Sequence, residues 1–352
     1  MEKEILIIAM PQEGNGGFDT LFQKAVLQVL DNRKIKYTFL TNNPAFKGKK
    51  EIIFIEDYSR YIAEIRNIKK KEYEAVISLV PIYKDHSILL IMANFYKNNC
   101  RYAVIEYDIE YSSKKFKKPL FYGKILNIFC CNMANIVKSL EGGPVDYKQF
   151  YKGYSDKIGA TIHPFIARFP IDFSQIENSR TVNKAEDYIL ILGSGDRDYE
   201  ILNKCGISKL QNLLFLLDLE DLKKGDTEKL KNMQAANPQI RIMGYKPFKN
   251  FIDILCGAKA VVIPIRKGSY CTGNISLFYS LALGKKVFIT KNENTIKYKA
   301  FAEFIDANTG NRLKEYAKIK DYYDQSASDY ARKNNAFSDV FSDILNKLEL
   351  PK

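Results

Sequence analysis

The stretch AKAVVIPIRKGSYCTGNISLFYSLALGKKVFIT, residues 258–290, decides the fold of this chain. It opens with an apolar run, Ala260 to Ile265, which predicts a buried parallel strand. After a loop, residues 273–283 carry apolar side chains at helical spacing, and Gly284 ends that helix before a second strand begins. The segment is therefore a strand, a loop, a helix and a second strand. In such a unit the loop lies at the carboxyl end of a parallel sheet, where open α/β proteins bind ligands.

The start of that helix has the features of an anion site. Its first backbone amides are free to face a negative group, and two cations, Arg266 and Lys267, lie just upstream. We interpret the segment as a phosphate site whose residues are Lys267, Thr272, Gly273, Asn274, Ile275 and Ser276. The local pattern also fits a plainer interpretation, a generic helix start beside a solvated loop.

Length and composition limit the classes of protein that the chain can represent. A chain of 352 residues is longer than one hydrophobic core usually accommodates, so its length predicts two domains. The net charge of +13 favours phosphate-bearing partners, but the lysines are spread along the chain, so we do not expect nucleic-acid binding. Two histidines make a zinc cluster implausible, and six cysteines without paired spacing favour the reducing cytoplasm. We see no secretory signal and no apolar stretch long enough to span a bilayer.

The first half reads as alternating strands and helices. A strand at 4–10, a loop ending in Gly16 and Gly17, a helix at about 18–30 and a strand at 36–40 open the chain. The two glycines permit close approach of the backbone to a ligand, or form a plain turn. The dinucleotide fingerprint is absent, because the glycine spacing differs and no acidic residue closes the second strand. Further strands are predicted at 51–55, 75–80, 102–106 and 125–131, which implies a parallel sheet.

The alternation of predicted strands and helices weakens over residues 141–184, and a second alternation begins after them. We place the interdomain linker near 170–185. The second half predicts strands at 188–192, 212–217, 239–243, 260–264 and 286–290. It predicts helices near 229–235, 248–256, 273–283 and 294–301, and a largely helical tail from 314 to 348. The chain is therefore expected to be α/β, with Rossmann-like domains at 1–175 and 185–325 and a C-terminal helical segment at 326–352.

Taken together, these segments resemble the GT-B glycosyltransferases over nearly the whole chain. The motifs that carry the resemblance are Gly16-Gly17, the loop from Gly193 to Arg197-Asp198-Tyr199, Met243-Gly244-Tyr245, and Thr272-Gly273-Asn274-Ile275-Ser276 followed by Ala282 to Val287. The resemblance implies two Rossmann-like domains facing each other across a cleft. It assigns the acceptor to the first domain and the nucleotide-sugar donor to the second, with the C-terminal helix crossing back to the first.

One departure from the family pattern concerns two carboxylates. Many relatives place two Glu eight positions apart, one touching the donor sugar and the other the ribose. Here these places fall at Cys271 and Tyr279, so neither carboxylate exists. This departure leaves open which donor the protein uses and whether it is an active enzyme.

The resemblance implies a glycosyltransferase that moves a sugar from a nucleotide-sugar donor to a glycan or lipid-linked acceptor in cell-surface polysaccharide or glycoconjugate biosynthesis. Arg197 would pair with the donor diphosphate, helped by Lys267 and the amides of 273–276, and Gly193, Gly244 and Tyr245 would line the donor site. We expect no metal and no cofactor besides the donor, since fixed cations can balance the leaving charge. A base would come from Asp108 or His86, although each also fits a helix-end polar residue.

Two alternatives to the transferase stay open, and so does the role of one loop. The missing Glu pair is compatible with a degenerate GT-B-like subunit that binds a nucleotide without turnover. A sugar-nucleotide epimerase on the same architecture would need more acidic residues and histidines in its cleft. The basic, aromatic loop at 112–122 is compatible with an anionic membrane surface, which would make the protein peripheral on the inner face of a membrane, or it is a solvated loop.

Overall fold

The structure is a computed structural model of the chain. It describes residues 4–9, 17–55, 68, 73–79, 100–106, 124–130, 160–166, 170–182, 186–193, 197–217, 219, 222, 224–244, 248–266, 273–292, 295–319 and 322–350.

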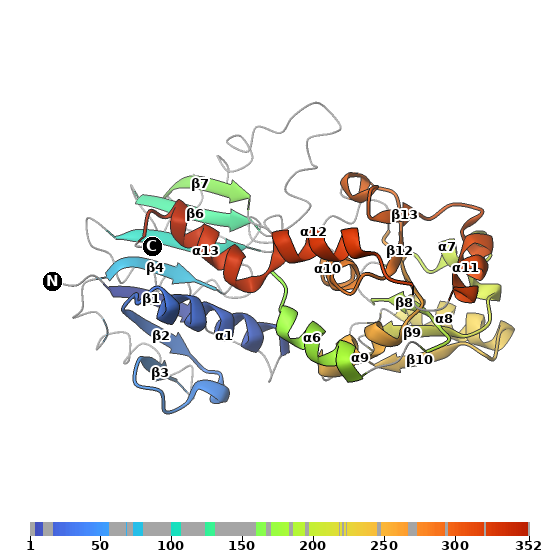
Figure 1. Ribbon diagram of the computed structural model, residues 1–352, viewed down its shortest axis with the longest axis horizontal. Helices are drawn as coiled ribbons and strands as arrows, with labels where there is room; N and C mark the ends of the chain where they lie inside the picture. The colour runs from blue at the N-terminus through green and yellow to red at the C-terminus, as the bar shows by residue number, and fades with distance from the viewer. Residues whose placement is uncertain are drawn as a thin grey trace. The chain divides into compact units, whose positions relative to one another are not determined.

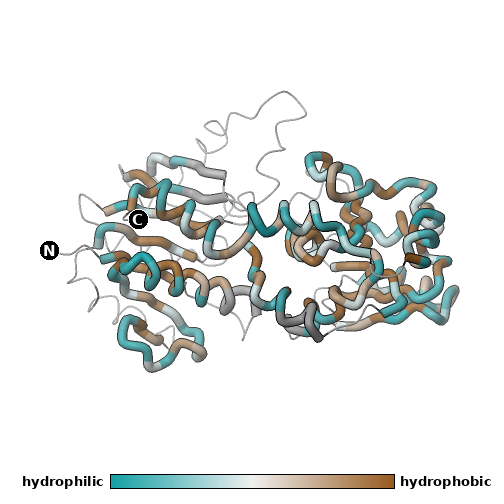
Figure 2. Tube along the Cα trace, viewed as in Figure 1, coloured by the Kyte–Doolittle hydropathy of each residue, from teal (hydrophilic) through white to brown (hydrophobic). Residues whose placement is uncertain are grey.

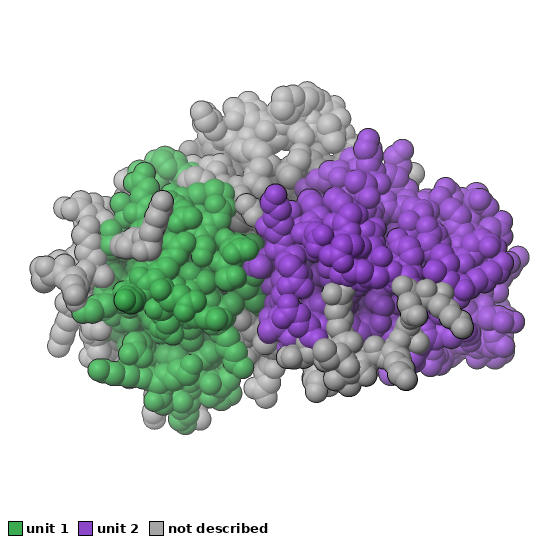
Figure 3. Space-filling model, viewed as in Figure 1, with its two compact units in different colours: residues 1–170, 337–352 green, residues 171–336 purple. Residues whose placement is uncertain are grey.

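The chain divides into two compact units (Figure 3). Unit 1 comprises Met1–Pro170 and Phe337–Lys352, and unit 2 comprises Ile171–Ala336. The sequence placed the interdomain linker near 170–185, which includes the first division at 170/171, and the second division at 336/337 follows the boundary expected at 325/326.

Unit 1 is built on a seven-stranded parallel sheet with the strand order β3-β2-β1-β4-β5-β6-β7. The apolar side chains of its central strands are buried, as their near-continuous apolar sequences predict. Figure 1 shows the arrangement of these strands, and Figure 2 shows the hydropathy of their residues. The strands are β1 (Glu4–Ala9), β2 (Tyr37–Thr41), β3 (Ile52–Phe54), β4 (Tyr73–Ser78), β5 (Arg101–Glu106), β6 (Lys124–Cys130) and β7 (Ala160–Ile166).

Two helices far apart in sequence cover one face of this sheet side by side (Figure 1). They are α1 (Gly17–Asn32) and α13 (Phe337–Lys347), and a short 3-10 turn, η1 (Pro44–Phe46), precedes β3. The rings of Phe22 and Phe337 lie 5.2 Å apart between the two helices. The end of the chain therefore packs into the core of unit 1, which confirms the expected return of the C-terminal helix.

Unit 2 is built on a six-stranded parallel sheet with the strand order β10-β9-β8-β11-β12-β13. The order reverses between β8 and β11, and this reversal is the topological switch point where open α/β sheets bind ligands. The strands are β8 (Ile189–Leu192), β9 (Leu213–Leu217), β10 (Arg241–Gly244), β11 (Ala260–Ile263), β12 (Lys286–Ile289) and β13 (Ala302–Phe304).

Helices cover both faces of the second sheet. The apolar side chains of α7 (Glu200–Lys204), α8 (Lys224–Ala236) and α11 (Thr309–Lys318) share one core with the strands. The crossover helices α9 (Phe248–Gly257) and α10 (Asn274–Ala282) link strands in the opposite direction, and right-handed connections therefore place them on the other face. The remaining elements are α6 (Phe173–Val182), α12 (Gln325–Asn335) and the 3-10 turns η4 (Ile207–Lys209) and η5 (Ile296–Tyr298).

The secondary structure differs from the predictions in four places. Strand β13, which has only three residues, was not predicted. Strand β7 was missed, because Pro164 interrupts its apolar pattern; a proline is tolerated there because β7 is an edge strand. Helix α6 lies where a linker was expected. The helix predicted over 294–301 is only the three-residue turn η5.

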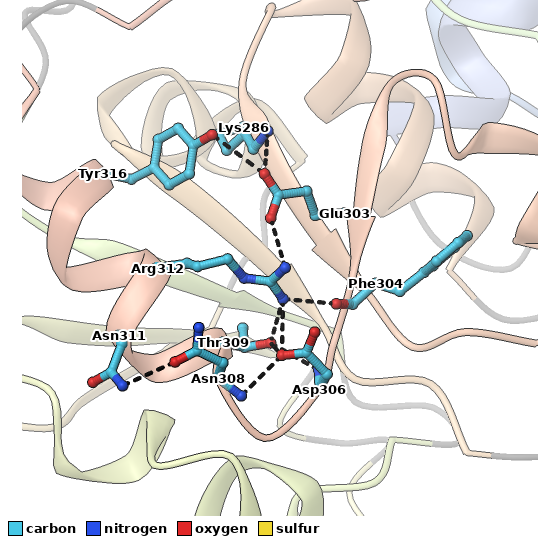
Figure 4. Close-up of polar contacts among 9 residues, drawn as sticks. All are labelled: Lys286, Glu303, Phe304, Asp306, Asn308, Thr309, Asn311, Arg312 and Tyr316. Atoms are coloured by element: carbon cyan, nitrogen blue, oxygen red, sulfur yellow. Dashed lines mark hydrogen bonds and ion pairs between the residues drawn. The ribbon is translucent and has the colours of Figure 1, made fainter.

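A polar network fixes α11 to the edge of the second sheet (Figure 4). The carboxylate of Glu303 on β13 accepts bonds from Lys286 at 2.6 Å and from the hydroxyl of Tyr316 at 3.2 Å, and it pairs with Arg312 at 3.2 Å. Arg312 also reaches Asp306 at 3.0 Å. Burial by itself would lower the pKa of Lys286, but its bonds to Glu303 and Tyr316 raise that pKa above the usual value.

Candidate functional site

The carboxyl edge of the second sheet gathers most of the described residues that the sequence assigned to the donor site. Gly193 follows β8, Gly244 ends β10, and Gly273 precedes α10, which connects β11 to β12. Because parallel strands end at one edge, these three positions lie at the same edge of the sheet. The site is therefore built at the switch point that the strand order defines.

The start of α10 has the geometry of an anion site. Gly273 caps the helix with φ +98°, a left-handed conformation that favours glycine. The first intrahelical bond runs from Leu277 N to Gly273 O, so the amides of Asn274, Ile275 and Ser276 have no partner within the helix. These free N–H groups carry the partial positive charge of the helix terminus.

Two buried oxygen atoms at this edge have no hydrogen-bond partner among the described residues. They are Oδ1 of Asn274, the first residue of α10, and Oγ1 of Thr290, which directly follows β12. Both residues are more than nine-tenths buried. An unpaired buried polar atom costs free energy, so each of these atoms favours a ligand that supplies a hydrogen-bonding group.

Arg197, predicted to meet the diphosphate, lies with its guanidinium folded against the end of β8. Its Nε donates to Leu192 O at 2.8 Å, and the residue is only 4% exposed. Gly193, with φ +91°, leaves room for the guanidinium: a Cβ at this position would lie 2.1 Å from Nη2 of Arg197. The side chain of Arg197 is thus held against the end of β8.

Residues 197 and 198 are also joined to the end of β11. Arg197 forms an antiparallel bridge with Ile265, and Asp198 N donates to Pro264 O at 2.7 Å. Tyr199 donates from its hydroxyl to Gly193 O at 2.9 Å, and burial raises the pKa of that hydroxyl well above the usual value. The ends of β8 and β11, the two strands of the switch point, are therefore fixed to each other.

Arg266, one of the two cations that the sequence places upstream of α10, and a carboxylate that the sequence did not assign complete this junction. Arg266 donates from Nε to Arg197 O at 2.7 Å and from Nη2 to Asp226 Oδ1 at 2.6 Å. Asp226 belongs to α8 and is almost fully buried. Its distance of 40 residues from Arg266 left no local signal that could reveal the pair.

An apolar patch lies at the same edge on the outer strands. Leu219, just after β9, is 55% exposed, and Met243 on β10 is 43% exposed. Gly244 lies beside them, since a Cβ there would be 3.5 Å from Leu219. Large exposed apolar side chains of this kind can support a flat ring.

Two features of the family-like motif have structural roles here. Tyr279, at the place of the second family Glu, is fully buried; its hydroxyl accepts a bond from Asp172 N at 3.3 Å, and burial raises its pKa. Lys285 donates to the carbonyls of Cys256 at 2.5 Å and Ala258 at 2.8 Å, where α9 ends. These two side chains hold α10 and α9 in place.

Several predicted residues lie outside the described part of the chain. They are His86 and Asp108, together with Gly16, Tyr245, Lys267, Cys271, Thr272 and the basic loop at 112–122. Gly17 is described and begins α1. Among the described residues, no group of three or more His, Cys, Asp or Glu is arranged to hold a metal ion. None of the described helices combines the length and the hydrophobicity that crossing a membrane requires.

Comparison by sequence finds no related family: no protein-family model matches the chain, and no curated protein does. Comparison by structure finds similar chains. AviGT4, a glycosyltransferase involved in avilamycin A biosynthesis, is 10% identical with a TM-score of 0.60, and the match covers 99% of this chain and 97% of that one.

Two further solved structures match along their whole length. The lipopolysaccharide outer core galactosyltransferase WaaB is 10% identical with a TM-score of 0.54, covering 98% of this chain and 99% of its own. A putative UDP-N-acetylglucosamine 2-epimerase from Listeria monocytogenes is 11% identical with a TM-score of 0.52, covering 99% and 96%. Together with the two parallel sheets and their strand orders, these likenesses show that the chain has the GT-B fold.

Proposed function

We propose that this protein is a glycosyltransferase that moves a sugar from a nucleotide-sugar donor to a glycan or lipid-linked acceptor. The observation that carries the proposal is the start of α10 at the switch point of the second sheet. Three free amides, a left-handed glycine and the buried, unpaired Oδ1 of Asn274 occur there together. Amides of this kind bind the phosphates of a donor, and an unpaired oxygen accepts from a sugar hydroxyl.

The same groups would also serve the reaction. When a sugar leaves its nucleotide, negative charge grows on the diphosphate, and donors already aimed at that charge lower the barrier. The helix-end effect is worth about 0.3–1 kcal/mol at an exposed terminus and more in a desolvated one. Fixed amides and cations can supply this stabilisation, so we propose a transfer that needs no metal.

The apolar patch formed by Leu219 and Met243 supports the nucleotide part of the proposal. A base is flat, and its faces are apolar enough to pack on such side chains, while Tyr245 follows directly in the sequence. We therefore assign the base to the ends of β9 and β10, and the phosphates to the start of α10.

Asp108 or His86 would act as the base if the reaction inverts the anomeric carbon. The acceptor would belong to cell-surface polysaccharide or glycoconjugate synthesis. A cytoplasmic location, with the basic loop at 112–122 on an anionic membrane face, agrees with the free thiols of Cys100, Cys205 and Cys256.

The first test is thermal stabilisation by a panel of nucleoside diphosphates and sugar nucleotides. A ligand present at a hundred times its dissociation constant adds about 2.7 kcal/mol. For a cooperative unit of this size the melting temperature rises by roughly 2–4 °C per kcal/mol, so a shift of about 5–10 °C is expected. The ligand with the largest shift is then assayed for release of nucleoside diphosphate with candidate acceptors.

Asn274→Asp tests where the ligand binds. The new carboxylate would lie beside the phosphates, so we expect the ligand-induced shift, measured against the ligand-free variant, to be largely lost. Asn308→Asp is the matched control, because Asn308 caps α11 at another helix start in the same unit. The control should keep the full shift.

The outcomes separate the alternatives. A shift that disappears in Asn274→Asp, together with nucleotide release, supports the transferase. A shift without release under any acceptor favours a nucleotide-binding subunit without turnover. No shift of the wild-type protein with any nucleotide contradicts the donor site.

A further inference from the structure

Arg266 has an unusual arrangement at the switch point. Two of its three guanidinium nitrogens are used inside the protein: Nε donates to Arg197 O at 2.7 Å, and Nη2 donates to Asp226 Oδ1 at 2.6 Å. Its side chain is nevertheless 39% exposed, whereas that of Asp226 is only 4% exposed. Within the described residues nothing bonds to Nη1. The guanidinium is therefore fixed along one edge and open along another.

The open nitrogen lies in a suitable place for an anion. Arg266 follows Ile265, which bridges to Arg197 in the loop after β8. Ile265 also packs on Gly273, the cap of α10, because a Cβ at Gly273 would lie 2.7 Å from its Cδ1. Arg266 is thus one residue from the point where the end of β8, the end of β11 and the start of α10 meet.

Asp226 explains why the guanidinium keeps its position. A buried carboxylate is costly unless it is paired, so Asp226 holds Arg266 strongly, and the bond to Arg197 O fixes the plane of the guanidinium. An arginine that is already fixed loses little conformational freedom when a ligand arrives. A planar guanidinium also matches the geometry of phosphate oxygens.

We propose that Arg266 binds a phosphate of the donor through its open Nη1 edge, and that Asp226 is the residue that positions it. The inference rests on the proposed function, which supplies the nucleoside diphosphate. It adds a cation to the donor site that differs from Arg197, whose guanidinium is buried against Leu192.

Binding of three probes to wild-type and variant protein tests the proposal. The probes are the nucleoside diphosphate that stabilises the wild-type protein most, the corresponding nucleoside, and inorganic pyrophosphate. Arg266→Met should weaken binding of the diphosphate and of pyrophosphate by roughly ten- to hundredfold, the range for one hydrogen bond to a charged group. Binding of the nucleoside should not change. Arg266→Lys keeps the positive charge but lacks the planar guanidinium, so its affinity for the diphosphate and for pyrophosphate should lie between those of the wild-type protein and Arg266→Met.

A matched control removes the same charge elsewhere. Arg241 is an exposed cation on the same sheet, at the amino end of β10, and it packs over the ring of Tyr188. Arg241→Met should leave the affinity for all three probes unchanged. Circular dichroism of each ligand-free variant establishes that the protein is folded before its binding is measured.

Asp226→Asn separates positioning from a purely structural role. If Asp226 acts through Arg266, the substitution weakens pyrophosphate binding in the wild-type background and has no further effect in the Arg266→Met background. A purely structural Asp226 would lower the melting temperature of the ligand-free protein and leave the affinity for pyrophosphate unchanged. That second result would overturn the positioning role.

The probes also separate this inference from the proposed function. Equal binding of diphosphate by wild-type protein and Arg266→Met would overturn the role of Arg266 and leave the donor site standing. Pyrophosphate binding that depends on Arg266, without binding of any nucleotide, would support the anion site and contradict the transferase. If the wild-type protein binds neither, both proposals fail.

Discussion

Gly193→Ala is expected to destabilise unit 2 through two separable effects. The first is backbone strain, because Gly193 has φ +91°, and a left-handed conformation costs a residue with a Cβ about 1–2 kcal/mol. The second is displacement of Arg197, because the new Cβ would lie 2.1 Å from its Nη2 and 2.7 Å from its Nε. The guanidinium would have to leave its bond to Leu192 O, and a hydrogen bond to a charged group is worth about 1.5–3 kcal/mol. The expected total is about 3–5 kcal/mol.

Gly206→Ala isolates the first effect. Gly206 also has positive φ, +70°, but a Cβ there would meet no atom within 4 Å. It should therefore cost only the strain of about 1–2 kcal/mol, and the difference between the two variants measures the displacement of Arg197. In an Arg197→Met background this difference should disappear.

Differential scanning calorimetry suits the comparison, since the chain has no tryptophan to report unfolding by fluorescence. At roughly 2–4 °C per kcal/mol, Gly193→Ala should lower the melting temperature of unit 2 by on the order of 10 °C, and Gly206→Ala by only a few degrees. Equal shifts for the two variants would refute the reasoning, because they would mean that Arg197 does not depend on the space over Gly193.

Two further predictions concern charge and pH. Glu303→Gln should destabilise the protein by about 1–3 kcal/mol in urea unfolding, because Lys286 and its neighbours lose a half-buried carboxylate, while Glu315→Gln, in an exposed pair, should change stability by less than about 0.5 kcal/mol. Stability should also fall as pH rises above about 10: burial raises the pKa of Tyr73 to about 12, so the folded state keeps a proton that the unfolded chain releases. The raised pKa of Lys286 also makes the folded state less stable as the pH rises. Tyr73→Phe should reduce the loss of stability between pH 10 and 12, and an unchanged loss would contradict the argument.

The sheets could be predicted from the sequence because a strand buried on both faces leaves a clear local signal. Apolar runs such as those at 260–264 and 286–290 coincide with β11 and β12 almost to the residue. Edge strand β7 lacked this signal, since His163 is exposed and Pro164 breaks the run. Helix α6 was missed for a similar reason: its sequence is mostly polar, although its residue Ile176 is buried, so it lacks the apolar periodicity that predicts a helix.

The site was predictable only as far as it is local. The free amides at the start of α10 and the glycines at 193 and 273 follow from strand, loop and helix order. The pairing of Arg266 with Asp226 depends on where α8 packs, and a sequence contains no short-range trace of such a contact. The sequence therefore assigned roles to Arg197 and Lys267 and named Arg266 only as a nearby cation, whereas the structure shows the contacts that fix the guanidinium of Arg266.

The start of α10 is also held by the rest of its helix. In the middle of α10, the hydroxyl of Tyr279 accepts a hydrogen bond from Asp172 N. At the far end of the helix, Ser328 Oγ donates to Ala282 O at 2.8 Å, and Asp324 N donates to Gly284 O at 2.8 Å. A helix held at these points cannot easily turn its first amides away from an anion. The stabilisation available to a growing negative charge is then present before the ligand binds, which is the condition under which fixed dipoles lower a barrier most. The tyrosine that replaces a family carboxylate therefore contributes to the proposed site through the position of the helix rather than through contact with the donor.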